Sequence, residues 1–176
     1  MKKKKQNSKS HMKILVIGSW EKCRAVSCKE EATKIGKLLA EKGHILISGG
    51  GTGVSEIVVN SYKENKGKKY TAYLPSKKEM EKVGEQLGPE PDEIIHTELD
   101  YPERNIIMVK NCDCVLACPG GLGTFTELIH ATADYKRKVA LIDKGDIVSW
   151  VKAIPYLKEK VFITSDINKA LEYLEK

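Results

Sequence analysis

The stretch that decides the fold runs from Cys114 to Glu127 and reads Cys-Val-Leu-Ala-Cys-Pro-Gly-Gly-Leu-Gly-Thr-Phe-Thr-Glu. Residues 114–118 form a short, continuous apolar run, which is typical of a buried strand. Three glycines follow, and the pattern then becomes helical from Thr124 to Lys136. The stretch therefore predicts a strand that passes through a glycine-rich turn directly into a helix.

The same unit occurs twice more toward the N-terminus. Residues 13–18 form an apolar run that ends in Gly-Ser, and Ala32, Ile35, Leu38 and Leu39 then fall on one helical face. A second apolar run at residues 44–48 ends in Gly-Gly-Gly-Thr-Gly at positions 49–53 and leads into a helix over residues 54–66. Repetition of strand and helix is the signature of a parallel sheet.

The remaining chain continues this alternation. Further strands are predicted at residues 69–74, 93–97, 139–142 and 161–164, and further helices at 101–110, 147–159 and 167–174, with Ser165 or Asp166 as the last N-cap. Residues 75–91 are polar and predict a loop with one short helix. Because the strands are almost wholly apolar, helices must cover both faces. We therefore predict an α/β, doubly wound, Rossmann-like parallel sheet of six or seven strands.

Length and charge indicate one nearly neutral domain. The chain has 176 residues and a formal charge of +6, but five of its 30 basic residues lie at positions 2–5 and 9, which leaves 25 basic against 24 acidic residues. We expect residues 1–12 to be a disordered basic tail or a cloning remnant, and residues 13–176 to form the single domain. No nucleic-acid partner and no membrane association are expected.

The five cysteines indicate a reducing compartment. The sequence shows no secretory signal, so we expect a cytoplasmic protein without a disulfide framework. The spacing of Cys112, Cys114 and Cys118 raises the question of a metal site, but the last two flank an apparent buried strand, where small apolar residues are the better interpretation. We predict neither a metal nor a resident cofactor.

Glycine turns at the ends of parallel strands meet at one edge of the sheet, which is where ligands bind in such folds. Glycine lets the backbone approach an anion, and the following helix offers free N–H groups. A phosphate is therefore the expected ligand. The alternative is that the glycines only make tight turns. The chain has no GxxxxGK[ST] motif and no GxGxxG after its first strand, which favours a monophosphate over a dinucleotide or triphosphate. The predicted binding residues are Gly18, Ser19, Gly50, Gly51, Thr52, Gly53, Gly120, Gly121, Gly123 and Thr124.

Two charged residues are candidates for chemistry near this cradle. Glu127 lies three residues beyond Thr124, and Arg104 lies on the preceding helix. Each has a plainer interpretation. Glu127 would stabilise the positive end of a helix dipole, and Arg104 would form a surface ion pair with Glu103 or Asp100.

The motif Pro-Gly-Gly-x-Gly-Thr-x-x-Glu at residues 119–127, preceded by Pro-Glu-Arg-Asn at 102–105, resembles the LOG ("Lonely Guy") family, often labelled "possible lysine decarboxylase". Gly18-Ser19, the triple glycine and Val161 to Ser165 extend the resemblance over nearly the whole domain. It implies a homodimeric phosphoribohydrolase that cleaves a nucleoside 5′-monophosphate to free base and ribose 5-phosphate. Arg104 and Glu127 would be catalytic, Gly120 to Thr124 would bind phosphate and Met108 would lie near the base.

Departures from the family pattern leave a second function open. The residue after the arginine is usually Lys and here is Asn105, the usual first Glu of the motif is Thr126, and the second glycine loop is shorter. The alternative is a non-catalytic carrier or sensor for a nucleotide or a molybdopterin-type cofactor. The decarboxylase label finds no support, since no lysine can be assigned to a pyridoxal Schiff base.

Overall fold

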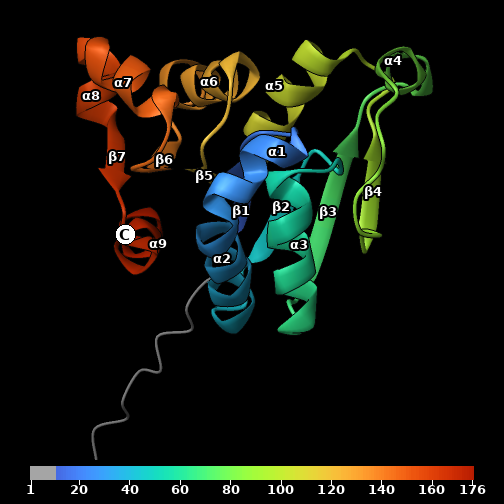
Figure 1. Ribbon diagram of the computed structural model, residues 1–176, viewed down its shortest axis with the longest axis horizontal. Helices are drawn as coiled ribbons and strands as arrows, with labels where there is room; N and C mark the ends of the chain where they lie inside the picture. The colour runs from blue at the N-terminus through green and yellow to red at the C-terminus, as the bar shows by residue number, and fades with distance from the viewer. Residues whose placement is uncertain (1–10) are drawn as a thin grey trace, which may run out of the picture.

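The computed structural model describes residues 11–176, so the predicted basic tail lies almost wholly outside the described residues. Its centre is a seven-stranded parallel sheet in the order β4-β3-β2-β1-β5-β6-β7 (Figure 1). The strands are β1 (Lys13–Ile17), β2 (Ile45–Ser48), β3 (Lys69–Leu74), β4 (Glu93–His96), β5 (Cys114–Ala117), β6 (Lys138–Ile142) and β7 (Val161–Thr164). This confirms the predicted parallel α/β fold and, of the six or seven strands predicted, the larger number.

The sheet order reverses at β1. The chain builds β1 to β4 outward in one direction and then returns to place β5 against the free side of β1, with Ile17 opposite Ala117. Such a switch point leaves a crevice at the carboxyl ends of the two central strands, because their following loops diverge to opposite faces of the sheet. The turns after β1 and β5 therefore flank the natural ligand site of this topology.

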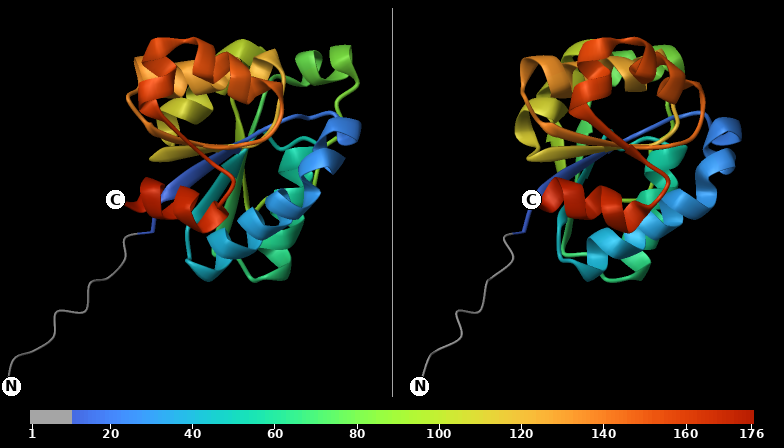
Figure 2. Two further views of the ribbon diagram at one scale, coloured as in Figure 1. Left: turned by 60° about the vertical axis from the view of Figure 1, so that its left-hand side comes forward. Right: turned by 90° about the vertical axis from the view of Figure 1, so that its left-hand side faces the viewer.

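Helices cover both faces of the sheet, as Figure 2 shows in the edge-on view. One layer holds α2 (Lys29–Glu41), α3 (Val54–Glu64) and α9 (Ile167–Glu175). The other holds α5 (Tyr101–Asn111), α6 (Leu122–Ile129), α7 (Asp146–Ala153) and α8 (Pro155–Lys160). The short helices α1 (Lys22–Ala25) and α4 (Lys77–Val83) lie near the cleft described below.

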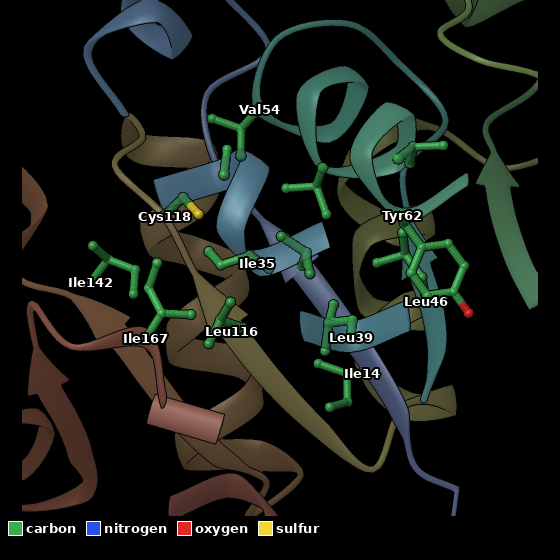
Figure 3. Close-up of a cluster of buried hydrophobic side chains, with 14 of the residues drawn as sticks. Ile14, Ile35, Leu39, Leu46, Val54, Tyr62, Leu116, Cys118, Ile142 and Ile167 are labelled. Atoms are coloured by element: carbon green, nitrogen blue, oxygen red, sulfur yellow. The ribbon is translucent and has the colours of Figure 1, made fainter. Parts of the chain in front are cut away.

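Alternate residues of each central strand enter opposite cores. Ile14 of β1 packs with Leu116, Ile35 and Leu39 beneath the first helix layer (Figure 3), whereas Leu15 joins the core beneath the second layer. Both faces of the strand are thus apolar, which is why the sequence shows continuous apolar runs. Burial of these side chains, worth roughly 1.5 to 3 kcal/mol each, fixes the strands whose ends carry the loops.

Two predicted helices differ in their boundaries, and one helical segment was not predicted. The helix expected at 147–159 is two helices, because Pro155 forces the preceding Ile154 into an extended conformation with φ −103° and ψ 111°. The helix expected at 124–136 begins earlier, at Leu122, and ends in a π-helical turn from His130 to Asp134. The turn after β1 contains α1 and a 3-10 turn (Val26–Cys28) that were not predicted.

Other local predictions agree with the structure. Asp166 caps α9, since its Oδ1 accepts hydrogen bonds from the backbone N–H groups of Asn168 and Lys169. Cys112, Cys114 and Cys118 are buried in the core, as expected of small apolar residues. Burial raises the pKa of the Cys112 thiol to about 12. Among residues 11–176, no helix has both the length and the apolar character needed to cross a bilayer.

Candidate functional site

A cleft of about 1300 Å³ lies where the glycine turns meet. It brings together Gly18, Ser19, Gly51, Thr52, Gly120, Gly121, Gly123, Thr124, Arg104, Met108 and Glu127 from the predicted set. Gly50 and Gly53 do not line it. Both have positive φ, and a Cβ at Gly50 would meet the Leu74 side chain at 2.6 Å, so these two glycines serve the turn itself.

The first turn of α6 has the form of an anion site. Gly121 is the N-cap residue, with no side chain to satisfy the free N–H groups of the helix start. Chain neighbours and the backbone of α6 aside, a Cβ at Gly123 would meet none of the described residues within 4 Å, and one at Gly121 would meet Nη1 of Arg24 at 3.8 Å. The glycines thus leave open space in front of the helix N-terminus, where a phosphate would be favoured.

Backbone hydrogen bonds join the three loops to one another. The Ser19 N–H donates to the Pro119 carbonyl at 3.0 Å, and the Ser19 carbonyl accepts from the Val54 N–H at 2.9 Å. The loop after β1 is therefore attached both to the start of α6 and to the start of α3. The loops around a ligand at the α6 N-terminus are therefore held in place by main-chain hydrogen bonds.

Glu127 is a buried, unpaired carboxylate that lines this cleft. The residue is 8% exposed, and its carboxylate has neither a hydrogen bond nor an ion pair with another of the described residues. Burial raises the pKa of Glu127 to about 7, and the positive charge of Arg104 limits that rise. Because Glu127 lies beyond the first turn of α6, stabilisation of the helix dipole does not explain its position.

This environment predicts a pH-dependent gain in stability for Glu127→Gln. Between pH 4.5 and 7 the unfolded chain ionises Glu127 while the folded protein keeps the proton, so the wild type loses stability as pH rises through that window. The free energy of unfolding of the variant, relative to wild type, should rise by roughly 2 to 3 kcal/mol from pH 5 to pH 8. Urea denaturation at both pH values measures this, and a constant difference would refute the raised pKa.

Arg104 is also buried, at 6% exposure, and its Nη1 donates to the carbonyls of Gly49 and Tyr73 at 2.8 and 2.7 Å. Its guanidinium carbon lies 5.3 Å from the centre of the Tyr101 ring, and its Nε is buried without a partner among the described residues. Burial lowers the pKa of Arg104, and the charge of Glu127 is the strongest opposing influence. The surface ion pair considered for Arg104 is therefore wrong, and Asp100 instead caps α5.

The remaining motif positions divide between cleft and surface. Met108 lines the cleft from the core side at 2% exposure. Asn105 also lines it, and its Oδ1 is buried without a partner among the described residues. Thr126 is exposed and donates to the Leu122 carbonyl at 2.9 Å, outside the cleft. Of the two departures at single positions, only Asn105 thus changes the cleft.

Other residues that line the cleft were not predicted from the sequence, among them Trp20, Arg24, Glu85 and Tyr101. The Tyr101 hydroxyl donates to Glu85 Oε2, and Glu85 also acts electrostatically on Arg104. Glu85 follows α4 in the segment with no interpretable pattern, so no local signal marks it. Trp20 and Arg24 directly follow the first glycine turn, and that proximity was an available signal.

Comparison with known proteins identifies the family and its relatives. Residues 11–171 match the SLOG cluster4 family. An uncharacterized protein of Archaeoglobus fulgidus is 37% identical over 74% of this chain and 80% of its own length. The rice cytokinin riboside 5′-monophosphate phosphoribohydrolase LOG is 30% identical over 90% of this chain and 66% of that protein, so the chain spans just under two thirds of its length. These matches confirm the resemblance to LOG proteins.

A solved structure of a protein with a different function shares the fold. The molybdenum cofactor binding protein from the phototrophic bacterium Rippkaea orientalis aligns with a TM-score of 0.75 and 26% identity, over 96% of this chain and 97% of that one. The two relatives thus differ in function, since one is named a phosphoribohydrolase of a riboside 5′-monophosphate and the other a molybdenum cofactor binding protein.

Proposed function

Because the chain belongs to the SLOG cluster4 family, we propose that its cleft binds a nucleoside 5′-monophosphate and hydrolyses the N-glycosidic bond. The observation that carries the proposal is Glu127, a carboxylate that is nine-tenths buried and unpaired in the same cleft as the glycine-lined start of α6. Leaving a carboxylate in such an environment costs stability, and such costs are typical of functional sites. The homodimer and the cytoplasmic location implied above belong to this proposal.

Different residues of the cleft suit the phosphate and the base of such a ligand. The phosphate would bind at the N-terminus of α6, against Gly121, Gly123 and the buried Thr124. The base would meet the apolar side chains of Trp20 and Val83, which line the same cleft and are 71% and 59% exposed. Large apolar side chains left exposed around one cleft are a common mark of a binding surface.

Hydrolysis would use the charge of Glu127. Cleavage of the bond between base and ribose builds positive charge on the sugar, and an ionised carboxylate in a closed site stabilises that charge. Water then adds to the sugar, the base leaves with a proton, and ribose 5-phosphate remains. Arg104 would hold the carboxylate partly ionised near neutral pH, since its positive charge opposes the effect of burial.

The second candidate is a non-catalytic carrier of a phosphorylated cofactor. It is favoured by the structural similarity to the Rippkaea orientalis protein and by Asn105, which places a neutral side chain in the cleft. A carrier needs the phosphate cradle but has no use for a carboxylate with a raised pKa. We therefore prefer the hydrolase.

The experiment that separates the two functions is a panel of nucleoside monophosphates incubated with the protein and analysed for free base and ribose 5-phosphate. The hydrolase predicts equimolar release of both products from at least one member. Binding without release from every member would favour the carrier.

The phosphate should be required for both binding and turnover. Since much of the binding energy is assigned to the helix N-terminus, removing the phosphate from a bound nucleotide should weaken binding by about 100-fold or more. Quenching of tryptophan fluorescence by matched nucleoside and nucleotide measures the difference, since Trp20 and Trp150 both line the cleft. Equal affinity for the two ligands would contradict the assigned cradle.

A further inference from the structure

We propose that Arg24 binds the ligand phosphate together with the first turn of α6. This inference rests on the proposed function only in taking the ligand to be phosphorylated. It assigns a role to a residue outside the sequence motif, in a helix that sequence patterns did not predict.

The contact geometry carries the assignment. Nη1 of Arg24 lies 3.8 Å from the position of a Cβ at Gly121 and is the one atom within 4 Å of it from the described residues other than Gly121 and its chain neighbours. Gly121 is the N-cap residue of α6 and lines the cleft, as does Arg24. The guanidinium thus lies next to Gly121, the residue that begins the helix, on the same cleft.

Local structure holds Arg24 in this place. Nε of Arg24 pairs with Glu21 Oε2 at 2.7 Å, which leaves the Nη groups available. Ala25 is 1% exposed and anchors α1 to the core. The hydrogen bond from Ser19 to Pro119 fixes the loop before α1 against the loop before α6. The side chain itself is 61% exposed, so Arg24 contributes little to the core and its presence at the cleft needs another reason.

Two further observations point to an anion at this position. Thr124 is 5% exposed and lines the cleft, yet its hydroxyl makes no hydrogen bond with any residue in the described range. Arg104, by contrast, donates Nη1 to two carbonyls and faces the charges of Glu127 and Glu85. A phosphate dianion therefore needs another cation, and the planar fork of Arg24 matches phosphate geometry.

The test compares Arg24→Gln with Lys29→Gln, a control with the same charge change at an exposed site outside the cleft. Calorimetric titrations use a nucleoside monophosphate, its nucleoside and inorganic phosphate. Arg24→Gln should lower the affinity for the monophosphate and for inorganic phosphate by about 20-fold or more. The affinity for the nucleoside should stay unchanged. Arg24→Lys should recover part of the loss, because it keeps the charge without the fork.

The outcomes are separable from those of the proposed function. Unchanged phosphate affinity in Arg24→Gln, or an equal loss for nucleoside and nucleotide, would overturn the assignment, as would a wild type that binds none of the phosphate-containing probes. Binding without turnover would exclude the hydrolase yet leave the role of Arg24 standing. Thermal unfolding of each variant within about 3 °C of wild type shows that the fold is intact.

Discussion

Glu127→Gln is expected to lower N-glycosidic hydrolysis by roughly 100-fold or more while leaving monophosphate affinity within about tenfold of wild type. The substitution keeps the size and hydrogen-bonding capacity of the side chain and removes only its negative charge. That charge stabilises the sugar mainly when positive charge has developed on it. The substitution therefore removes more stabilisation from the transition state than from the bound ground state. Single-turnover rates and equilibrium affinities for one monophosphate measure the two effects separately.

Glu103→Gln is the matched control. It removes the same charge from an exposed position on α5, one residue from Arg104, and should change neither rate nor affinity appreciably. Turnover by Glu127→Gln at the wild-type rate would remove Glu127 from the chemistry. Arg104→Ala should impair both binding and turnover, and it should also destabilise the fold, because Arg104 satisfies the carbonyls of Gly49 and Tyr73.

Gly121→Val is expected to weaken monophosphate binding by about 100-fold or more with the fold retained. The backbone at Gly121 has φ −93° and ψ −156°, an extended conformation that valine adopts readily, so no backbone strain is introduced. The new side chain would instead extend toward the Arg24 guanidinium, whose Nη1 lies 3.8 Å from the position of its Cβ. Calorimetry with a monophosphate, together with thermal unfolding, distinguishes loss of binding from loss of structure.

Thr126→Val is a suitable comparison for the Gly121 substitution. It places the same β-branched side chain on α6, at an exposed position outside the cleft, and should leave affinity unchanged. Gly121→Ala should give an intermediate loss, because one methyl group fills less of the space. Wild-type affinity in Gly121→Val would exclude the N-terminus of α6 as the phosphate site.

The fold was predictable because its signals are local. The run from Cys114 to Cys118 is buried on both faces and is followed at once by a glycine turn, so strand and turn are both visible in sequence. The break at Pro155 was missed because the helical pattern continues across it, although a proline at that position is itself a boundary signal. Helix α1 was missed because four residues give too short a pattern.

The cleft was predictable only in part. The glycine turns follow strands of a parallel sheet, and topology alone brings such turns to one edge. Burial of Glu127 and Arg104 depends on how α5 and α6 pack, which a motif does not reveal. Glu85 reaches the cleft through a segment that follows no strand directly, and its contact with Tyr101 depends wholly on tertiary structure. Residues of this kind carry no periodic or motif signal.

The most direct test of the central claim is a single-turnover product analysis with wild-type protein in excess over a nucleoside monophosphate that it binds. We predict that free base and ribose 5-phosphate appear in equal amounts, at a rate that falls roughly 100-fold or more in Glu127→Gln. A wild type that holds the nucleotide tightly and returns it intact after prolonged incubation would contradict the hydrolase and identify the cleft as a carrier site.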